Sequence, residues 1–381
     1  MRNVALIFGG ESAEHEVSII TAMQILNGYT KEEFNLIPLF LSKNNTWFLG
    51  ERGLTPKDYI NPENNKALKK VEFVFGCNAF KIVKSKKQPL HFDCAILATH
   101  GGAGENGELI SLLNFVKIKV AGDYLGQALG YDKIMAKMIC QSQKINTLPF
   151  KWFYLSEWKL SPINILKEIK KLGLPVIVKP DRQGSSIGVS VCKTMSEIVQ
   201  AVNLAFEFDS KVIVEPALTN FREFNCSCLG IAGEKILVSD VDEPAKIHDI
   251  LTFEDKYVGS SKISGKQKIS KPVSKATGSL DKMPRSFLND QKLVERIKTI
   301  SQRITRLLNL NGVVRIDYLY DCKKKKVYFN EVNTVPGSLA FYFWQKVGIN
   351  INELVAMLVK IADKQAENSI DINPDFITKI I

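Results

Sequence analysis

The chain has 381 residues, of which 45% are hydrophobic and 24% charged, and its formal net charge is +11. This length and apolar content predict a globular protein of two or three domains. No apolar run approaches the length of a membrane span, and the start is too quickly polar for a secretory signal, so we expect a cytoplasmic protein. The seven cysteines form no CxxC pair, so we expect neither a zinc site nor a disulfide framework.

The N-terminal segment has the pattern of a strand, a turn and a helix. Val4–Phe8 is a short apolar run typical of a buried strand, and Gly9 and Gly10 follow it as a turn. Residues 12–26 continue with a helical pattern, in which Glu14 lies near the start and complements the helix dipole.

A second unit of the same kind follows later in the chain. Residues 95–98 predict a strand, THGGAGENG a glycine loop that contains His100 and Glu105, and residues 109–116 a helix. Ligands of open α/β sheets bind at such strand ends, so both side chains are candidate site residues. Neither glycine loop is GxGxxG and no GxxxxGK[ST] is present, which argues against dinucleotide and P-loop enzymes.

The pattern changes around residues 121–123, where we place the end of a first domain. Asp132 is in a position to cap the next helix, and Lys133 would then lie in its first turn. Further along, the strand pattern of residues 211–215 ends in an acid and is followed by Glu223, which predicts two acids at a domain junction.

A glycine- and serine-rich hairpin precedes that junction. Residues 175–180 form a strand pattern with Lys179 near its end, and the loop DRQGSSIG, which contains Ser185 and Ser186, leads into a returning strand. A flexible backbone of this kind can fold over phosphates, and Lys179 would supply a cation for them. The alternative is an ordinary connecting loop.

A charged hairpin lies near the C-terminus, on either side of the run Lys323–Lys326. Arg315 and Asp317 are two residues apart, as are Glu331 and Asn333, so each pair projects from one face of its strand. A register symmetric about the turn places Asp317 opposite Glu331 and Arg315 opposite Asn333. Facing carboxylates destabilise a sheet unless a cation lies between them, and such oxygen ligands suit Mg²⁺ with substrate phosphates. The hairpin predicts a Mg-nucleotide site; the alternative is a surface hairpin with solvated charges.

Seven motifs occur in order along the chain. They are FGGESAEHEVS (8–18), HGGAGENG (100–107), YDK (131–133), VIVKPDRQGSSIGVS (176–190), EDKY (254–257), RID (315–317) and NEVNTVPGS (330–338). In this order they resemble the D-alanine–D-alanine ligase family of the ATP-grasp superfamily. The resemblance implies an α/β protein with an N-terminal Rossmann-like parallel-sheet domain (1–122) and a two-part ATP-grasp fold. Its central subdomain would span residues 123–215, and its C-terminal subdomain, with a closing loop at 247–281, residues 216–381.

The resemblance also implies an activity. The enzyme would use ATP to join two D-alanines into D-alanyl-D-alanine for peptidoglycan synthesis, and hence for the cell wall and cell shape. Because a carboxylate is a poor electrophile, the reaction would pass through an acyl phosphate. The implied cofactors are ATP and two Mg²⁺ ions, with Mn²⁺ as a substitute. The implied partners are D-alanine, ATP and a second copy of the chain, without nucleic acid or membrane.

Residue roles follow from the same motifs. The resemblance implies catalytic roles for Glu14, Ser185, Tyr257, Arg315 and Gly337. It implies amino-acid contacts for His100, Glu105 and Ser338. It implies nucleotide contacts for Lys133, Lys179, Ser186, Glu215, Glu223 and Lys256. It implies metal binding by Asp317, Glu331 and Asn333.

Three alternatives remain open. The same fold can join D-alanine to D-serine or D-lactate, although Tyr257 stands where lactate-selecting relatives tend to carry a histidine. A paralogue that binds ATP without turnover would keep the same motifs. The charge and the lysine-rich segment 259–279 also fit a nucleic-acid-binding module, whose binding would fall steeply with salt.

Overall fold

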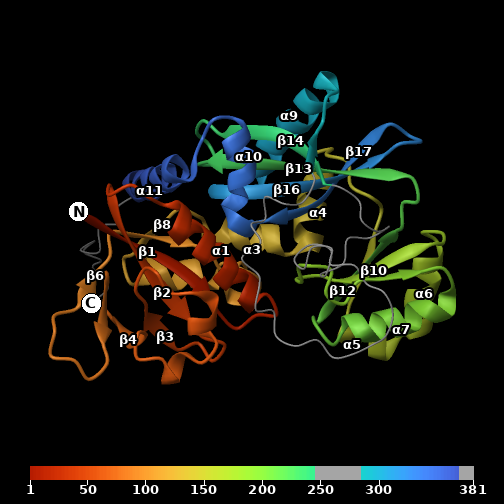
Figure 1. Ribbon diagram of the computed structural model, residues 1–381. Helices are drawn as coiled ribbons and strands as arrows, with labels where there is room; N and C mark the ends of the chain where they lie inside the picture. The colour runs from red at the N-terminus through yellow and green to blue at the C-terminus, as the bar shows by residue number, and fades with distance from the viewer. Residues whose placement is uncertain (245–284, 369–381) are drawn as a thin grey trace, which may run out of the picture.

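The computed structural model describes residues 1–244 and 285–368, which form three β-sheets with helices packed against them (Figure 1). The predicted closing loop 247–281, with Lys256 and Tyr257, lies outside the described residues. Within them, no helix is both long and apolar enough to cross a membrane.

The first sheet has eight strands in the order β6-β5-β4-β3-β2-β1-β7-β8. They are β1 (Arg2–Gly9), β2 (Phe34–Leu41), β3 (Trp47–Leu49), β4 (Lys69–Val74), β5 (Ala79–Ile82), β6 (Leu90–His91), β7 (Cys94–Leu97) and β8 (Lys119–Val120). β1 pairs in parallel with β2 and β7, and β7 with β8, which confirms the predicted parallel sheet. β3 to β6 add an antiparallel edge that the sequence analysis did not predict.

Helices from both ends of the chain cover this sheet. They are α1 (His15–Gly28), α2 (Glu108–Phe115) and α11 (Ile351–Asn368). α1 begins at His15 rather than at Ser12, because the Ser12 hydroxyl accepts a hydrogen bond from the Glu14 N–H (2.8 Å) and holds a turn before the helix. α11 contributes Leu354 and Leu358 to the core of the first sheet, so the last described helix returns to the N-terminal part of the fold.

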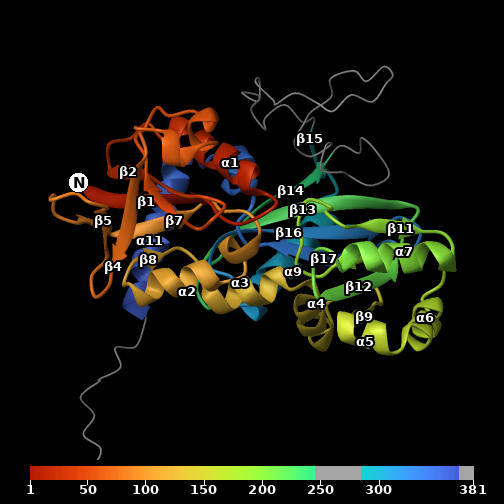
Figure 2. The same cartoon turned by 90° about the horizontal axis from the view of Figure 1, so that it is seen from below.

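The second sheet is antiparallel, with the strand order β11-β10-β12-β9. Its strands are β9 (Lys151–Tyr154), β10 (Val176–Pro180), β11 (Ser190–Cys192) and β12 (Lys211–Pro216). Its helices are α5 (Leu155–Leu160), α6 (Pro162–Lys170) and α7 (Met195–Ala205), which lie together on one side of it (Figures 1 and 2). Val176 and Val178 pack toward these helices, so Ile177 and Lys179 face the opposite side.

The third sheet is antiparallel, with the order β15-β14-β13-β16-β17. Its strands are β13 (Phe221–Gly230), β14 (Leu237–Pro244), β15 (Arg285–Phe287), β16 (Gly312–Asp321) and β17 (Lys326–Asn333). The remaining α-helices of the described residues are α3 (Tyr124–Tyr131), α4 (Lys133–Ser142), α9 (Gln291–Leu307) and α10 (Phe341–Lys346). This part of the chain also has four 3₁₀ helices, Pro56–Tyr59, Pro62–Asn64, Gly102–Gly104 and Gly337–Ala340.

Helix α4 joins the core of the third sheet although it precedes the second sheet in the chain. Its Ala136 and Cys140 pack with Ile297 of α9 and Phe329 of β17. The predicted domain boundaries at residues 122 and 215 stay predictions. Helix α4, from the predicted central subdomain, packs on the third sheet, and α11, from the predicted C-terminal subdomain, packs on the first sheet.

The β16–β17 hairpin has the predicted register at its charged end. Asp317 lies opposite Glu331, and Arg315 opposite Asn333. The register shifts after Asp317, so that Tyr318 pairs with Phe329 and Asn330 is an additional residue on β17. Such a bulge redirects side chains. Because Phe329 and Val332 both belong to the core, the two residues between them, Asn330 and Glu331, are left for the other face.

Candidate active site

A cavity of about 740 Å³ lies where the three sheets meet. Loops of the first sheet, strands of the second and the β16–β17 hairpin all contribute to its wall. The predicted site residues that line it are Glu14, His100, Glu105, Lys133, Lys179, Ser185, Ser186, Glu223, Arg315, Asp317, Glu331, Asn333 and Gly337. The structure therefore brings together residues that are more than 300 positions apart in the chain.

Asp317 is the centre of a hydrogen-bonded cluster on the hairpin. Arg315 donates to both of its carboxylate oxygens, from Nε at 2.7 Å and from a terminal nitrogen at 2.8 Å, and Asn333 Nδ2 donates at 3.1 Å. When the side-chain amide of Asn225 on β13 is turned so that its nitrogen faces Asp317, it donates a further hydrogen bond of 3.2 Å to that carboxylate. Burial opposes the charge of Arg315, but Asp317 outweighs it, so the pKa of Arg315 stays well above its usual value.

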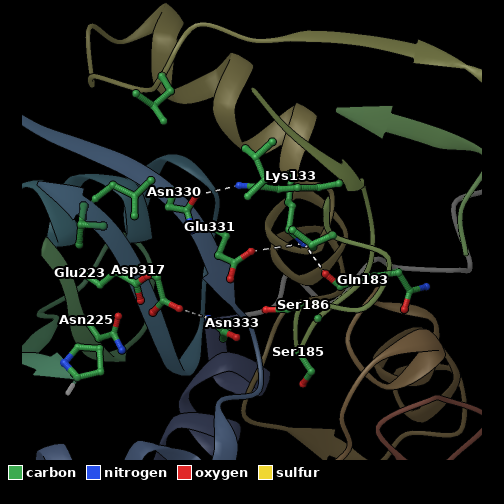
Figure 3. Close-up of a pocket in the computed structure, with 18 of the residues that line it drawn as sticks. Lys133, Gln183, Ser185, Ser186, Glu223, Asn225, Asp317, Asn330, Glu331 and Asn333 are labelled. Atoms are coloured by element: carbon green, nitrogen blue, oxygen red, sulfur yellow. Dashed lines mark hydrogen bonds and ion pairs between the residues drawn. The ribbon is translucent and has the colours of Figure 1, made fainter. Parts of the chain in front are cut away.

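Glu331 lies beside Asp317 in the cavity wall and faces a lysine. Its carboxylate is 3.5 Å from the Lys133 ammonium. A dashed line marks this ion pair in Figure 3. Asp317, Glu331 and the Asn333 carbonyl form a donor set of oxygens only, next to lysines that suit phosphates. Mg²⁺ prefers such a set, in which one or two carboxylates act together with substrate oxygens, so the residues present fit this ion. No cluster of three His, Cys, Asp or Glu side chains that could hold a metal occurs within residues 1–244 and 285–368.

Two lysines enter the cavity from different elements. Lys133, the first residue of α4, donates to the backbone carbonyl of Gln183 (2.7 Å), and its predicted helix cap is confirmed, since Asp132 accepts from Met135 N (2.8 Å). Lys179, on β10, donates to Glu215 (2.8 Å) and to Asn330 of the bulge (3.4 Å). Burial opposes the charge of Lys179, but the carboxylate of Glu215 outweighs it and raises its pKa.

The glycine loop between β10 and β11 is held at its base and strained at its tip. Arg182 donates to Asp209 from its backbone (2.7 Å) and its guanidinium (2.6 Å), which fixes the start of the loop. Ser185 and Ser186 have φ angles of 49° and 61°, a left-handed conformation that costs free energy for residues with a side chain. The Ser185 hydroxyl donates to Glu14, so the loop of the second sheet contacts the first sheet across the cavity.

The first sheet contributes three polar side chains, Glu14, His100 and Glu105, from the ends of β1 and β7. Glu105 accepts hydrogen bonds from Gly101 N (2.8 Å) and Val335 N (3.1 Å) and so joins this sheet to the segment after β17. Burial and the nearby Glu14 charge raise its pKa. His100 Nε2 lies 2.8 Å from the Thr21 hydroxyl, and burial lowers its pKa to about 4, so its ring is neutral.

Two predicted residues are close to the cavity but do not line it. Glu215 is 0% exposed and lies between the ammonium groups of Lys179 and Lys137, both at 2.8 Å, so its contact with adenine or ribose stays a prediction. Ser338 is buried and its hydroxyl donates to Gln24.

The structure also adds residues that the sequence analysis did not select. Gln183, Asn225, Asn330 and Tyr342 line the cavity, and Lys137 lies behind it. A signal existed for Lys137, because it follows Lys133 by four residues and therefore lies on the same face of α4. No sequence signal marks Asn330, whose orientation depends on the bulge.

Comparisons with known proteins agree over nearly the whole chain. The family profile described as D-ala D-ala ligase N-terminus matches residues 3–123, and the one described as D-ala D-ala ligase C-terminus matches residues 139–360. A D-alanine–D-alanine ligase of Thermosipho melanesiensis is 33% identical, over 94% of this chain and 93% of its own. One from Prochlorococcus marinus (strain MIT 9312) is 31% identical, over 94% and 97%.

Solved structures show the same arrangement. The VanG D-Ala:D-Ser ligase of Enterococcus faecalis is 25% identical, with a TM-score of 0.75 over 95% of this chain and 99% of its own. The D-alanine–D-alanine ligase of Helicobacter pylori is 25% identical, with a TM-score of 0.70 over 94% and 98%. The two matched profiles include every residue that lines the cavity except Lys133.

Proposed function

The chain belongs to the D-alanine–D-alanine ligase family, and from this premise we propose that it joins two D-alanines with ATP, through an acyl phosphate, for peptidoglycan synthesis. The observation that carries this proposal is the layout of the cavity. Lys133 and Lys179 lie beside the facing carboxylates of the hairpin, and the glycine loop reaches from this part of the cavity to Glu14, to which its Ser185 donates. The lysines and the loop suit nucleotide phosphates, and Glu14 suits the ammonium of an amino acid.

The chemistry requires two displacements. A carboxylate oxygen of the first D-alanine attacks the γ-phosphorus of ATP, the bond from that phosphorus to the β-γ bridging oxygen breaks, and ADP leaves. The amine of the second D-alanine then attacks the acyl carbon, phosphate leaves with the oxygen that it received, and the new amide nitrogen loses a proton. Both steps move negative charge, so fixed cations and backbone N–H groups have the largest effect on the rate.

The residues of the second and third sheets are placed for the charge in these steps. Lys133 and Lys179 would contact the phosphates, together with the Ser186 loop, and Lys256 is a further candidate outside the described residues. Arg315 and the backbone N–H of Gly337 would face the oxyanion that forms when the amine attacks. In the family's pattern, Glu223, which lines the cavity, would lie by the ribose. Glu215 would lie by the adenine.

Asp317, Glu331 and Asn333 would hold two Mg²⁺ ions, for which Mn²⁺ can substitute. When bound, the ions neutralise the phosphate oxygens of the nucleotide. The chain's own part is to keep the oxygens aligned: Arg315 and Asn333 fix the carboxylate of Asp317, and Lys133 lies beside that of Glu331.

The first D-alanine would bind on the side of the first sheet. The carboxylate of Glu14 would pair with the ammonium of this D-alanine. The Ser185 hydroxyl donates to the Glu14 carboxylate and holds it in place. His100 and Glu105 would form the wall of this subsite. Tyr257, from the closing loop, would complete the group of Glu14 and Ser185 and protect the acyl phosphate from water.

The second subsite decides between D-alanine and another nucleophile. The relatives from Thermosipho and Prochlorococcus are named for D-alanine alone, which favours D-alanine, whereas the similar Enterococcus structure is a D-Ala:D-Ser ligase. We keep Ser338 as the candidate contact for the second carboxylate and D-serine or D-lactate as the alternative substrates. We also propose that the protein works in the cytoplasm as a homodimer.

Phosphate release with Mg-ATP tests this proposal when D-alanine alone is compared with D-alanine plus D-serine or D-lactate and the products are identified by mass. We expect release with D-alanine alone and D-alanyl-D-alanine as the product. A mixed product in preference would change the second substrate. ATP binding without any release would instead favour the non-catalytic paralogue.

A further inference from the structure

Lys137 is a buried lysine for which the proposed mechanism has no use. It lies on α4, one turn after Lys133, and is 1% exposed. Its ammonium is 2.8 Å from one carboxylate oxygen of Glu215 and 5.9 Å from the ring centre of Phe329. A buried charge costs free energy unless it is paired. Any role proposed for Lys137 therefore has to explain why a charged side chain occupies this buried position.

Glu215 connects this lysine to the cavity. Its second carboxylate oxygen is 2.8 Å from the ammonium of Lys179, whose side chain is 12% exposed and lines the cavity. Glu215 itself is 0% exposed. The order from the interior outward is therefore Lys137, Glu215, Lys179 and then the cavity.

The three side chains come from two parts of the fold. Glu215 lies opposite Ile177 on β10, so Lys179, two residues further along, is its diagonal neighbour on the same face of the second sheet. Lys137 approaches this face from α4, which packs on the third sheet. The carboxylate is thus held from both sides and cannot turn toward one lysine without leaving the other.

The charge balance shows what Lys137 adds. A pair of Glu215 and Lys179 alone would be neutral, and the ammonium at the cavity wall would have little net attraction for an anion. One carboxylate between two ammonium groups leaves one net positive charge. Of these three side chains only Lys179 lines the cavity, so the net positive charge of the group is available there.

We propose that Lys137 is a positioning residue that neutralises Glu215 from behind, so that the Lys179 ammonium keeps a net positive charge for a nucleotide phosphate. This inference rests on the proposed function, since it takes the anion in the cavity to be ATP. Burial opposes the charge of Glu215, but Lys137 and then Lys179 outweigh it and lower its pKa to about 2, so the carboxylate is ionised at neutral pH.

The test is a double-mutant cycle on ATP affinity. Lys137→Met removes the charge and keeps an unbranched side chain, and we expect it to raise the Kd for Mg-ATP about tenfold or more. Glu215→Gln alone and the double variant Lys137→Met/Glu215→Gln complete the cycle. Their Kd values should agree within about threefold, because Lys137 acts on ATP only through the Glu215 charge and both variants share any loss of the Glu215 contact with adenine. Lys144→Met, at the exposed turn after α4, loses the same charge and should leave the Kd unchanged.

Calorimetric titration without D-alanine keeps this test separate from ligase activity. If Lys137→Met binds ATP as the wild type does, or if it weakens ATP binding by the same factor with and without Glu215→Gln, the inference is wrong and Lys137 does not act through Glu215. If the wild type binds no ATP, the proposed function itself fails. Should Lys137→Met not fold, Lys137→Gln loses the charge but can still donate to Glu215, and the same pattern with Glu215→Gln is expected.

Discussion

Asp317 on β16 lies opposite Glu331 on β17, and each carboxylate has its own cation, Arg315 for Asp317 and Lys133 for Glu331. Facing carboxylates would otherwise destabilise the hairpin. Because the chain supplies both cations, the hairpin is stabilised by its own residues, and a bound metal is left with a role in the reaction rather than in folding.

Removal of divalent metal should therefore separate activity from stability. We expect a chelator in excess to abolish phosphate release with D-alanine, and to shift the Tm of the nucleotide-free protein by less than about 2 °C, since roughly 0.5 kcal/mol or less would be lost. Phosphate release and thermal unfolding with and without the chelator measure both. A large drop in Tm would show instead that the metal stabilises the fold.

Glu14 should determine the affinity for the first D-alanine. Glu14→Gln removes the negative charge but keeps the shape and an acceptor for Ser185, so D-alanine should bind about tenfold to a hundredfold more weakly. Calorimetry with D-alanine, Mg²⁺ and a non-hydrolysable ATP analogue measures this affinity.

Glu16 provides the matched control for that variant. It lies two residues later, in the first turn of α1, is exposed, and pairs with Lys43 at 2.6 Å on the surface. Glu16→Gln should leave D-alanine affinity unchanged. Equal affinities for the two variants would rule out Glu14 as the partner of the ammonium.

His100 should make the protein less stable in acid. Its pKa is about 4 in the folded state because it is buried, against 6.5 as the ordinary value. The unfolded chain therefore binds a proton that the folded chain does not as the pH falls from 6.5 to 4. This histidine should lower the free energy of unfolding by about 2 kcal/mol between pH 7 and pH 5.

Denaturant unfolding at the two pH values tests the role of His100. His100→Gln should show a smaller loss of stability between pH 7 and pH 5 than the wild type. His91→Gln, at an exposed position, serves as the control and should keep the wild-type loss. The same pH dependence in all three proteins would contradict the assignment.

Ser338 is the proposed contact for the second D-alanine, although its hydroxyl donates to Gln24 in the structure. If that hydroxyl turns to the substrate, Ser338→Ala should raise the D-alanine concentration needed for dipeptide formation about fivefold, the value of one hydrogen bond. Steady-state rates over D-alanine concentration measure this. Unchanged rates with a lower Tm would show that the hydroxyl only stabilises the turn.

The charged hairpin shows how far sequence reasoning can reach. Side chains two residues apart share one face of a strand, so the pairing of Asp317 with Glu331 follows from the positions of the charges and the turn. The bulge at Asn330 does not follow, because it depends on how Phe329 and Val332 both reach the core. The predicted register was correct for the pairs Asp317–Glu331 and Arg315–Asn333, and incomplete at the bulge beside them.

Lys137 and Ser338 show a second limit. Periodicity places Lys137 on the same helical face as Lys133, but only the folded structure, in which α4 packs on the third sheet and Lys137 reaches Glu215 of β12, shows that the two side chains meet. Ser338 follows the glycine of its motif, yet residues 338–340 all have φ angles of 51° to 53°, which turns this segment into a left-handed path that the sequence does not announce. Both depend on contacts between distant parts of the chain.

The most direct test of the central claim is the fate of the carboxylate oxygen. D-alanine labelled with ¹⁸O in its carboxyl group is incubated with the protein and Mg-ATP, and the released phosphate and the dipeptide are analysed by mass spectrometry. An acyl phosphate predicts one ¹⁸O in each phosphate, with D-alanyl-D-alanine formed in equal amount. Unlabelled phosphate, or release without dipeptide, would contradict the account.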